Sequence, residues 1–190
     1  MKDYNRRDFI KTIGLLYGSL LIAPACTPSS VNQGYQAFTE EEAACLIALC
    51  EQIIPRDEYP GATDAGVIHF IDKQSKLRFP DERTLFKNGV ASLQTWCKAT
   101  YNKLFEDLDA STQITVIQSM EKDEIKSDLW KVSPKEFFNK LLNRTMQGFY
   151  GSPRHGGNKD YVSFKMMKLD YPALMGQNRY KQLRIKNYEL

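Results

Sequence analysis

Apolar residues recur at helical spacing through most of the chain, and this period predicts a series of amphipathic helices. The first is expected to start after Thr39, because Thr39 and Glu42 have the spacing of a capping box, and to end at Pro55. A second helix is expected to follow, with Thr63 or Asp64 as its cap. The buried positions expected on these two helices are Ala43, Leu46, Ile47, Cys50, Ile53, Ile54, Val67, Ile68 and Ile71.

The longest periodic stretch runs from Asp81 to Phe105 and predicts one long helix with an aromatic-rich buried face. A shorter helix capped by Asp109 or Ser111 is expected next. The last helix is expected after Ser133, where Ser-Pro-Lys-Glu combines the spacing of a capping box with a proline in the first turn. The buried positions expected on these three helices are Leu85, Phe86, Gly89, Val90, Leu93, Trp96, Cys97, Tyr101, Leu104, Phe105, Ile114, Val116, Ile117, Met120, Phe137, Phe138, Leu141, Leu142, Met146 and Phe149.

The helical period stops after residue 150, and residues 151–164 are rich in both glycine and aromatic residues. Because no strand pair with alternating polarity stands out, we expect an all-α fold. It is a single-domain helical bundle over residues 39–172 with a long glycine- and aromatic-rich C-terminal loop. Either the loop's aromatic residues form an interface or lid, or it is a long Ω-type loop packed on its own bundle. Residues 173–190 form a polar, basic tail.

The beginning of the chain carries an export pattern. Two adjacent arginines, Arg6 and Arg7, are followed by Phe9, Ile10 and Lys11 and then by a short apolar run, and this resembles a twin-arginine signal read by the twin-arginine translocase. The run is shorter than the ~20 apolar residues that span a bilayer. We therefore interpret residues 1–25 as a signal peptide; the alternative is an ordinary secretory leader with a charged head. Twin-arginine cargo crosses the membrane folded, so the expected location is the periplasm.

The signal peptide is followed by a cysteine with two interpretations. Cys26 comes directly after Ala23-Pro24-Ala25, which fits ordinary signal cleavage, and before a polar stretch typical of a lipoprotein tether. We favour lipidation of Cys26, with residues 26–38 as a flexible tether. Contact with the membrane would then be through the lipid only.

Composition narrows the class of protein. The formal net charge is +3 and part of it lies in the leader, so no nucleic-acid-binding surface is indicated.

Cys45 and Cys50 lie five residues apart on one predicted helix and point in different directions, which rules out a disulfide bridge between them. A Cys50–Cys97 bridge is possible, but three buried free thiols are favoured.

Candidate chemistry on the chain is sparse. The sequence has no dinucleotide-binding fingerprint, phosphate loop, haem attachment motif or His/Cys cluster, so we expect no catalytic, cofactor-binding or metal-binding residues on this chain. His69 lies in a predicted helix and is interpreted as structural. The alternative for catalysis is His155 as a base oriented by Asp160 in the late loop.

Several segments together resemble one family. These are the Ile-Ile-Pro at 53–55, the Pro-Gly-Ala-Thr-Asp-Ala-Gly-Val at 60–67 with Phe-Ile-Asp at 70–72, the Phe-Tyr-Gly at 149–151, the His-Gly-Gly-Asn at 155–158 and the Tyr-Pro at 171–172. With the twin-arginine leader, they resemble the gluconate 2-dehydrogenase subunit 3 family.

The resemblance implies a small, non-catalytic subunit of a periplasmic dehydrogenase complex. Its large partner is typically an FAD-dependent flavoprotein of the glucose-methanol-choline type that oxidises sugars, sugar acids or glycosides. Electrons often leave through a cytochrome c subunit, which carries haem c. The small chain is thought to carry its partner through the membrane and to support maturation of the flavoprotein.

The leading hypothesis is therefore an escort and structural subunit. The alternatives are a self-contained periplasmic sugar-modifying enzyme that uses His155 and Asp160, and a lipid-anchored module that docks a redox partner. The residues predicted to contact the partner lie in segments without a helical face of their own. They are Tyr59, Pro60, Tyr150, His155, Gly156, Gly157, Asn158, Tyr161 and Phe164.

Overall fold

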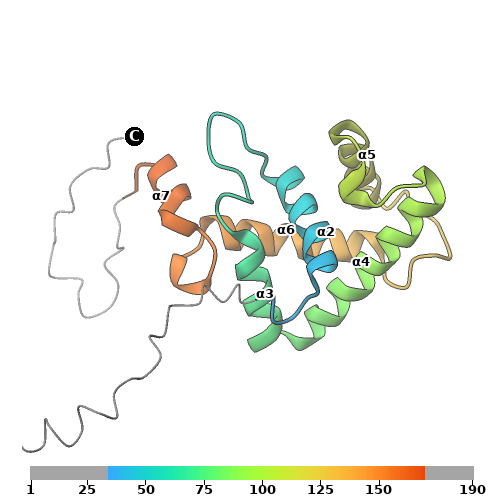
Figure 1. The fold of residues 1–190 in the computed structure, drawn as a ribbon, viewed down its shortest axis with the longest axis horizontal. Helices are drawn as coiled ribbons and strands as arrows, with labels where there is room; N and C mark the ends of the chain where they lie inside the picture. Colours follow the sequence, from blue (N-terminus) through green and yellow to red (C-terminus); the bar gives the residue numbers. More distant parts are fainter. Residues whose placement is uncertain (1–33, 170–190) are drawn as a thin grey trace, which may run out of the picture. The chain divides into compact units, whose positions relative to one another are not determined.

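The computed structural model describes residues 34–169, and within this range every regular element is a helix (Figure 1). The all-α prediction is confirmed. The chain divides after Gln33 into two units, and the described residues belong to the second. The export signal, Cys26 and the polar tail lie outside the described residues.

The elements follow one another through connections of different lengths, and the longer ones are residues 54–66 and 122–133. They are α2 (Glu40–Ile53), α3 (Val67–Leu77), α4 (Pro80–Tyr101), η1 (Phe105–Asp107), α5 (Ala110–Glu121), α6 (Pro134–Tyr150), η2 (Pro153–His155), η3 (Lys159–Tyr161) and α7 (Val162–Met166), where η marks a 3-10 turn. In this part of the chain, no helix combines the length and the apolar composition that crossing a membrane requires.

The predicted helix starts agree with the structure where side chains cap them. The Thr39 hydroxyl accepts from the Glu42 amide at 3.2 Å, and the Glu42 carboxylate accepts from the Thr39 amide at 3.0 Å, which completes the capping box of α2. Asp109 caps α5 by accepting from the Thr112 amide at 3.0 Å. Ser133 caps α6 in the same way.

Two predicted helix limits are wrong, and left-handed residues explain both. Helix α3 starts at Val67, because Gly66 in the left-handed conformation (φ 63°) precedes it. Asp64 instead accepts a hydrogen bond from the Gly61 amide at 3.0 Å. Helix α4 ends at Tyr101, because Asn102 is left-handed (φ 56°).

The residues after Tyr101 do not continue the buried face of α4. Phe105 is buried from the η1 turn, whereas Leu104 is 39% exposed. Ile114 on α5 and Met146 on α6 were also expected to be buried but are each 43% exposed. The helical period alone did not distinguish these positions from the true core face.

Large aromatic side chains build the core where α4 and α6 meet. Phe86 on α4 contacts Phe38 and Phe137, with ring centroids 6.3 Å apart and edge-to-face geometry in both pairs. Gly89, one turn after Phe86, leaves the space that the Phe137 ring fills. The two helices can therefore approach closely only because this position has no side chain.

The folded domain begins before residue 39, within the segment that was predicted to be a flexible tether. Ala37 and Phe38 are buried, and the carboxylate of Asp72 on α3 accepts from the Gln36 amide at 2.9 Å and the Ala37 amide at 2.7 Å. Asp72 is itself buried, so these bonds satisfy its charge away from water. The tether limit at residue 38 is therefore wrong, because residues 36–38 are fastened to the bundle.

The three cysteines of the described domain are free and buried, as favoured, and the possible Cys50–Cys97 bridge is not formed. Burial raises the pKa of Cys50 to about 12, although its hydrogen-bonding contact with Thr145 at 3.2 Å opposes the shift. Burial also raises the pKa of Cys97 to about 12 and that of Cys45 well above its ordinary value. These thiols remain protonated at neutral pH and are weak nucleophiles.

Replacing Gly89 by alanine should separate α4 from α6. A Cβ atom at this position would overlap the buried ring of Phe137. We expect the free energy of unfolding to fall by ~1–3 kcal/mol through overpacking, despite a gain of ~0.5–1 kcal/mol in helix propensity. Urea denaturation followed by circular dichroism measures the change. Adding Phe137→Leu should recover part of the loss, and simple additivity of the two losses would show that this contact is not the cause.

Candidate functional site

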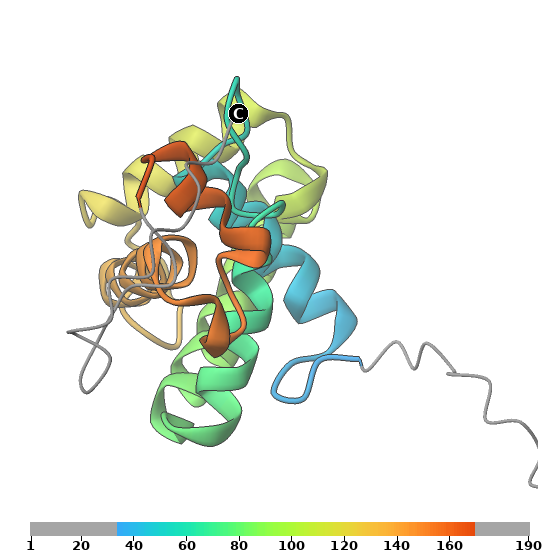
Figure 2. The ribbon, with the colours of Figure 1, turned by 90° about the vertical axis from the view of Figure 1, so that its left-hand side faces the viewer.

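The segment after α6, residues 151–166, is called the late segment. It folds back onto the bundle instead of forming a free lid (Figure 2). Two glycines allow this packing. A Cβ at Gly157 would overlap the backbone of Gly148 on α6, and Gly156, which is left-handed (φ 108°), lies against the backbone of His69 on α3. Of the two interpretations of the late segment, the structure agrees with the one that packs it on its own bundle.

Asn158 holds this segment in place. Its side chain is fully buried, its Nδ2 donates to the Gly151 carbonyl at 2.9 Å, and its Oδ1 accepts from the Ser163 amide at 3.0 Å. Its backbone is left-handed (φ 47°), a conformation that asparagine tolerates better than most residues. The next amide, of Lys159, donates to the Ala65 carbonyl at 2.9 Å. Asn158 therefore positions the segment from within.

Gly148 on α6 is the point where three segments meet. A Cβ there would lie 3.1 Å from the ring of Phe70 and 3.2 Å from Val67, both on α3, and the Gly148 backbone also touches Gly157. Helix α3 and the late segment thus both pack closely on the same turn of α6. Their convergence places side chains from all three segments around one cleft.

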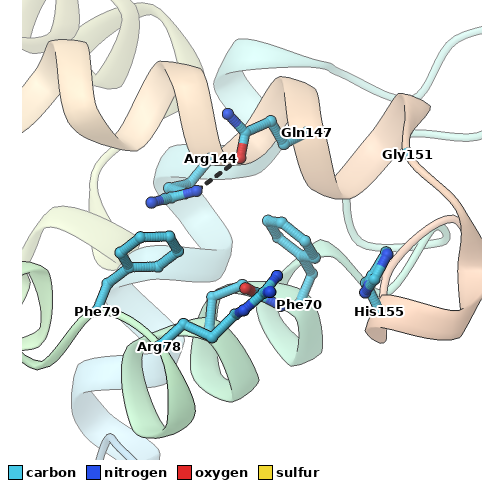
Figure 3. Close-up of a pocket in the computed structure, with 8 residues that line it drawn as sticks. Phe70, Arg78, Phe79, Arg144, Gln147, Gly151 and His155 are labelled. Carbon is cyan, nitrogen blue, oxygen red and sulfur yellow. Dashed lines mark hydrogen bonds between the residues drawn. The ribbon is translucent and has the colours of Figure 1, made fainter.

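This cleft has a volume of about 390 Å³ and lies between α3, α6 and the late segment. Figure 3 shows Phe70 of α3 and Arg78, which follows α3, between the Arg144–Phe79 pair on one side and His155 on the other. Its lining residues are Phe70, Gln74, Arg78, Phe79, Arg144, Gln147, Gly151 and His155.

One of the two cleft arginines is fully engaged. The guanidinium of Arg144 makes a bidentate pair with Glu82, at 2.7 Å and 2.8 Å, and donates to Gln147 Oε1 at 2.7 Å (Figure 3). It also lies 4.1 Å from the centre of the Phe79 ring. Partial burial alone would raise the pKa of Glu82, but the hydrogen bond and charge of Arg144, with Lys140, lower it.

His155 lies in positively charged surroundings. Its Nε2 accepts from Arg154 Nε at 3.0 Å, and the Lys73 ammonium lies 3.4 Å from the Arg154 carbonyl. Partial burial, and then the charges of Arg154, Arg78 and Lys73, lower the pKa of His155 below its ordinary value. The ring is therefore neutral at pH 7.

The proposed catalytic pair is not assembled. No hydrogen bond joins His155 to Asp160 in the described segment, and Asp160 is exposed with a left-handed backbone (φ 55°). His69 stacks on Tyr35, with ring centroids 5.8 Å apart, which agrees with a structural role. Across residues 34–169, no three His, Cys, Asp or Glu side chains gather as a metal site would require.

The loop before α3 projects from the bundle and carries two of the predicted interface residues (Figure 1). Tyr59 is 42% exposed and Pro60 is half-buried. The base of the loop is fastened by Glu51, whose carboxylate accepts from the Arg56 amide at 2.9 Å and the Thr63 hydroxyl at 2.6 Å. The loop is therefore held in one conformation although its tip is exposed.

The other predicted interface residues divide by exposure. Tyr150 is 37% exposed, and His155, Gly156, Tyr161 and Phe164 are half-buried. These remain predicted contacts. Gly157 and Asn158 are buried, so for them the interface prediction is replaced by the structural roles described above.

Sequence reasoning missed the residues that join His155 in the cleft. Arg78 and Phe79 lie between two helices, at positions that no motif singles out. Gln74 and Gln147 are polar positions on otherwise ordinary helices. Basic residues at 73, 76 and 78 were a signal, but only the folded chain brings Lys73 and Arg78 next to His155.

A second groove lies between α2 and α4 and has the opposite charge. Its volume is about 520 Å³, with an apolar floor and glutamates around it. Its lining residues are Glu40, Glu41, Glu42, Ala44, Val90, Ala91, Gln94, Leu104 and Glu106. The domain thus presents one basic and one acidic concave surface.

Comparison with protein families gives one result. The family model described as gluconate 2-dehydrogenase subunit 3 matches residues 40–170, from the start of α2 to just past the late segment. No curated protein and no solved structure matches the chain.

Asn158→Ala should release the late segment from the bundle. The change removes two buried hydrogen bonds and the residue type that tolerates the left-handed backbone. We expect a loss of ~1–3 kcal/mol in the free energy of unfolding and faster amide exchange in residues 151–166. Asn158→Asp keeps the acceptor for Ser163 but places a buried carboxylate oxygen against the Gly151 carbonyl, so it should destabilise at least as much as alanine. An unchanged rate of amide exchange in Asn158→Ala would show that Asn158 does not hold the late segment on the bundle.

Arg78→Gln should raise the pKa of His155, because it removes one of the cations that disfavour the imidazolium. An NMR titration of the ring protons measures this, with His69→Gln identifying which signal belongs to His155. The effect should shrink at high salt. Stability should also fall as pH drops below ~6.5, since a depressed pKa means that the unfolded chain binds more protons. An unchanged titration midpoint in Arg78→Gln would show that Arg78 does not face the ring.

Proposed function

The chain belongs to the gluconate 2-dehydrogenase subunit 3 family, and we propose that it is the small, non-catalytic subunit of a periplasmic FAD-dependent dehydrogenase complex. The catalytic partner in this proposal is a flavoprotein of the glucose-methanol-choline type that oxidises a sugar, a sugar acid or a glycoside. A cytochrome c with haem c serves as the electron acceptor. The small chain supplies the twin-arginine signal and supports maturation of the flavoprotein.

The observation that carries the proposal is that side chains able to do chemistry have structural tasks in this domain. His69 stacks on Tyr35, and Asp72 binds two backbone amides. The His155 ring accepts a hydrogen bond from Arg154, and the thiols are buried with raised pKa. Such a domain is suited to binding and support, and the redox chemistry is assigned to the partner.

The order of events follows from the type of signal. Twin-arginine export moves folded cargo, so one leader can export two chains if they bind each other before translocation. The described domain supports this with exposed, preformed features, namely the projecting loop with Tyr59 and the cleft around His155. After export, lipidated Cys26 would hold the complex at the membrane surface.

The alternatives give different biochemical results. A self-contained enzyme would turn over a sugar or glycoside when purified alone, and His155→Ala would abolish that activity. The described residues include no hydrogen bond between His155 and Asp160, and this does not favour the alternative. A lipid-anchored docking module would bind a redox protein that is exported on its own.

Replacing Arg6 and Arg7 by lysines should leave both this chain and the flavoprotein in the cytoplasm. Lysine keeps the charge of the leader but removes the pattern that the translocase reads. Cell fractionation with detection of both proteins measures the distribution. Lys2→Arg is the matched control, because it also replaces one kind of basic residue in the leader by the other. It should leave export intact. Arrival of the flavoprotein in the periplasm without the twin arginines would contradict the escort role.

A further inference from the structure

The basic cleft contains cations that the fold does not neutralise. Glu82 is the carboxylate at this site, and Arg144 and Lys140 both pair with it, the second at 3.5 Å. Arg78 has no ion-pair partner among residues 34–169 and is exposed at the end of α3. The charged groups that act on His155 are all cations, namely Arg154, Arg78 and Lys73. The site therefore attracts negative charge.

The cleft also offers apolar surface close to these charges. Phe70 forms its floor and is 7% exposed, and Phe79 forms a half-buried wall. An aromatic centre surrounded by exposed cations is the usual anatomy of a protein interface, in which arginine and aromatic residues contribute most to affinity. A small-molecule anion would instead require buried polar anchors, because such sites enclose most of their ligand. Here the exposed Arg78 lines the cleft, the exposed Lys73 and Arg154 lie near His155, and the buried Gln74 carries no charge.

We propose that the cleft docks an acidic segment of the catalytic subunit, with a carboxylate against Arg78 and His155 and a neighbouring apolar side chain against Phe70. This inference rests on the proposed function, because it assigns the site where the two chains bind. Charge complementarity identifies the occupant, since the exposed Arg78 lines the cleft, Lys73 and Arg154 lie near His155, and the cleft residue Arg144 is already paired with Glu82. Binding should therefore weaken with added salt.

The geometry of the late segment makes the cleft a preformed site. His155 is held by Arg154 and by the turn that Asn158 fastens to Gly151. Arg144 is held by Glu82, so it fixes the Phe79 ring without offering its charge to a partner. Little side-chain ordering is then needed on binding, apart from that of Arg78 and Lys73.

The test uses the full chain, affinity-tagged at its C-terminus and expressed with its native complex, and measures the flavin that co-purifies per chain. Arg78→Glu should lower the recovered flavin about tenfold or more. Lys73→Glu, in the middle of α3, should lower it as well without altering a helix end. The matched control is Lys103→Glu, which changes the net charge equally but lies beyond the far end of α4, about 30 Å away. It should behave as wild type.

Thermal melting of each variant shows whether it is folded, and only folded variants are compared. A second readout is the pKa of His155, which a bound carboxylate should raise in the complex relative to the chain alone. Equal flavin recovery with Arg78→Glu, Lys73→Glu and Lys103→Glu would overturn the docking site while leaving the escort function intact. Absence of flavin with the wild-type chain would instead overturn the proposed function.

Inorganic phosphate tests the small-anion alternative on the chain alone. If phosphate raises the pKa of His155 while Arg78→Glu leaves flavin recovery unchanged, the cleft binds small anions and the docking proposal is wrong. Loss of flavin recovery in both Arg78→Glu and Lys73→Glu, even when the complex is purified at low salt, supports the docking proposal.

Discussion

The close packing of three segments around Gly148 determines where the cleft residues lie. Helix α3 approaches α6 at this glycine through Val67 and Phe70, and the late segment covers the same turn through Gly157. Any side chain at either glycine would push the layers apart. Because the contacts are between backbone and neighbouring side chains, small displacements there would move Phe70 and His155 together.

Electrostatic pairing then decides which charges remain available. Glu82 pairs with Arg144 and holds it over Phe79. This arginine therefore lines the cleft without offering an unpaired charge. Lys73 on α3 and Arg78, which follows the last residue of α3, pair with no carboxylate among residues 34–169 and keep their charge exposed. Partial burial, with the charges of Arg154 and then of these two residues, lowers the pKa of His155 below its ordinary value. A basic surface with a neutral histidine suits recognition of a carboxylate better than proton transfer within this chain.

These features fit a subunit whose contribution to an oxidoreductase complex is binding. Its thiols are buried and protonated, which makes them poorly reactive toward oxidants. Its first loop and its cleft are both held in place by hydrogen bonds from buried or fastened residues such as Glu51 and Asn158. Rigid binding surfaces lower the entropic cost of association, which is what the proposed escort role requires.

The sequence by itself determined the all-α class, the capped starts of α2, α5 and α6, the free cysteines and the family, because these depend on local period, capping chemistry and short motifs. It also pointed to His155 as a residue of interest. Only the tertiary structure decided that Asn102 ends α4, that Asn158 is buried, and that Arg78 joins His155 in one cleft. Those outcomes depend on contacts between residues as far apart as α3 and the late segment, and no local pattern encodes which distant segment packs on a given helix face.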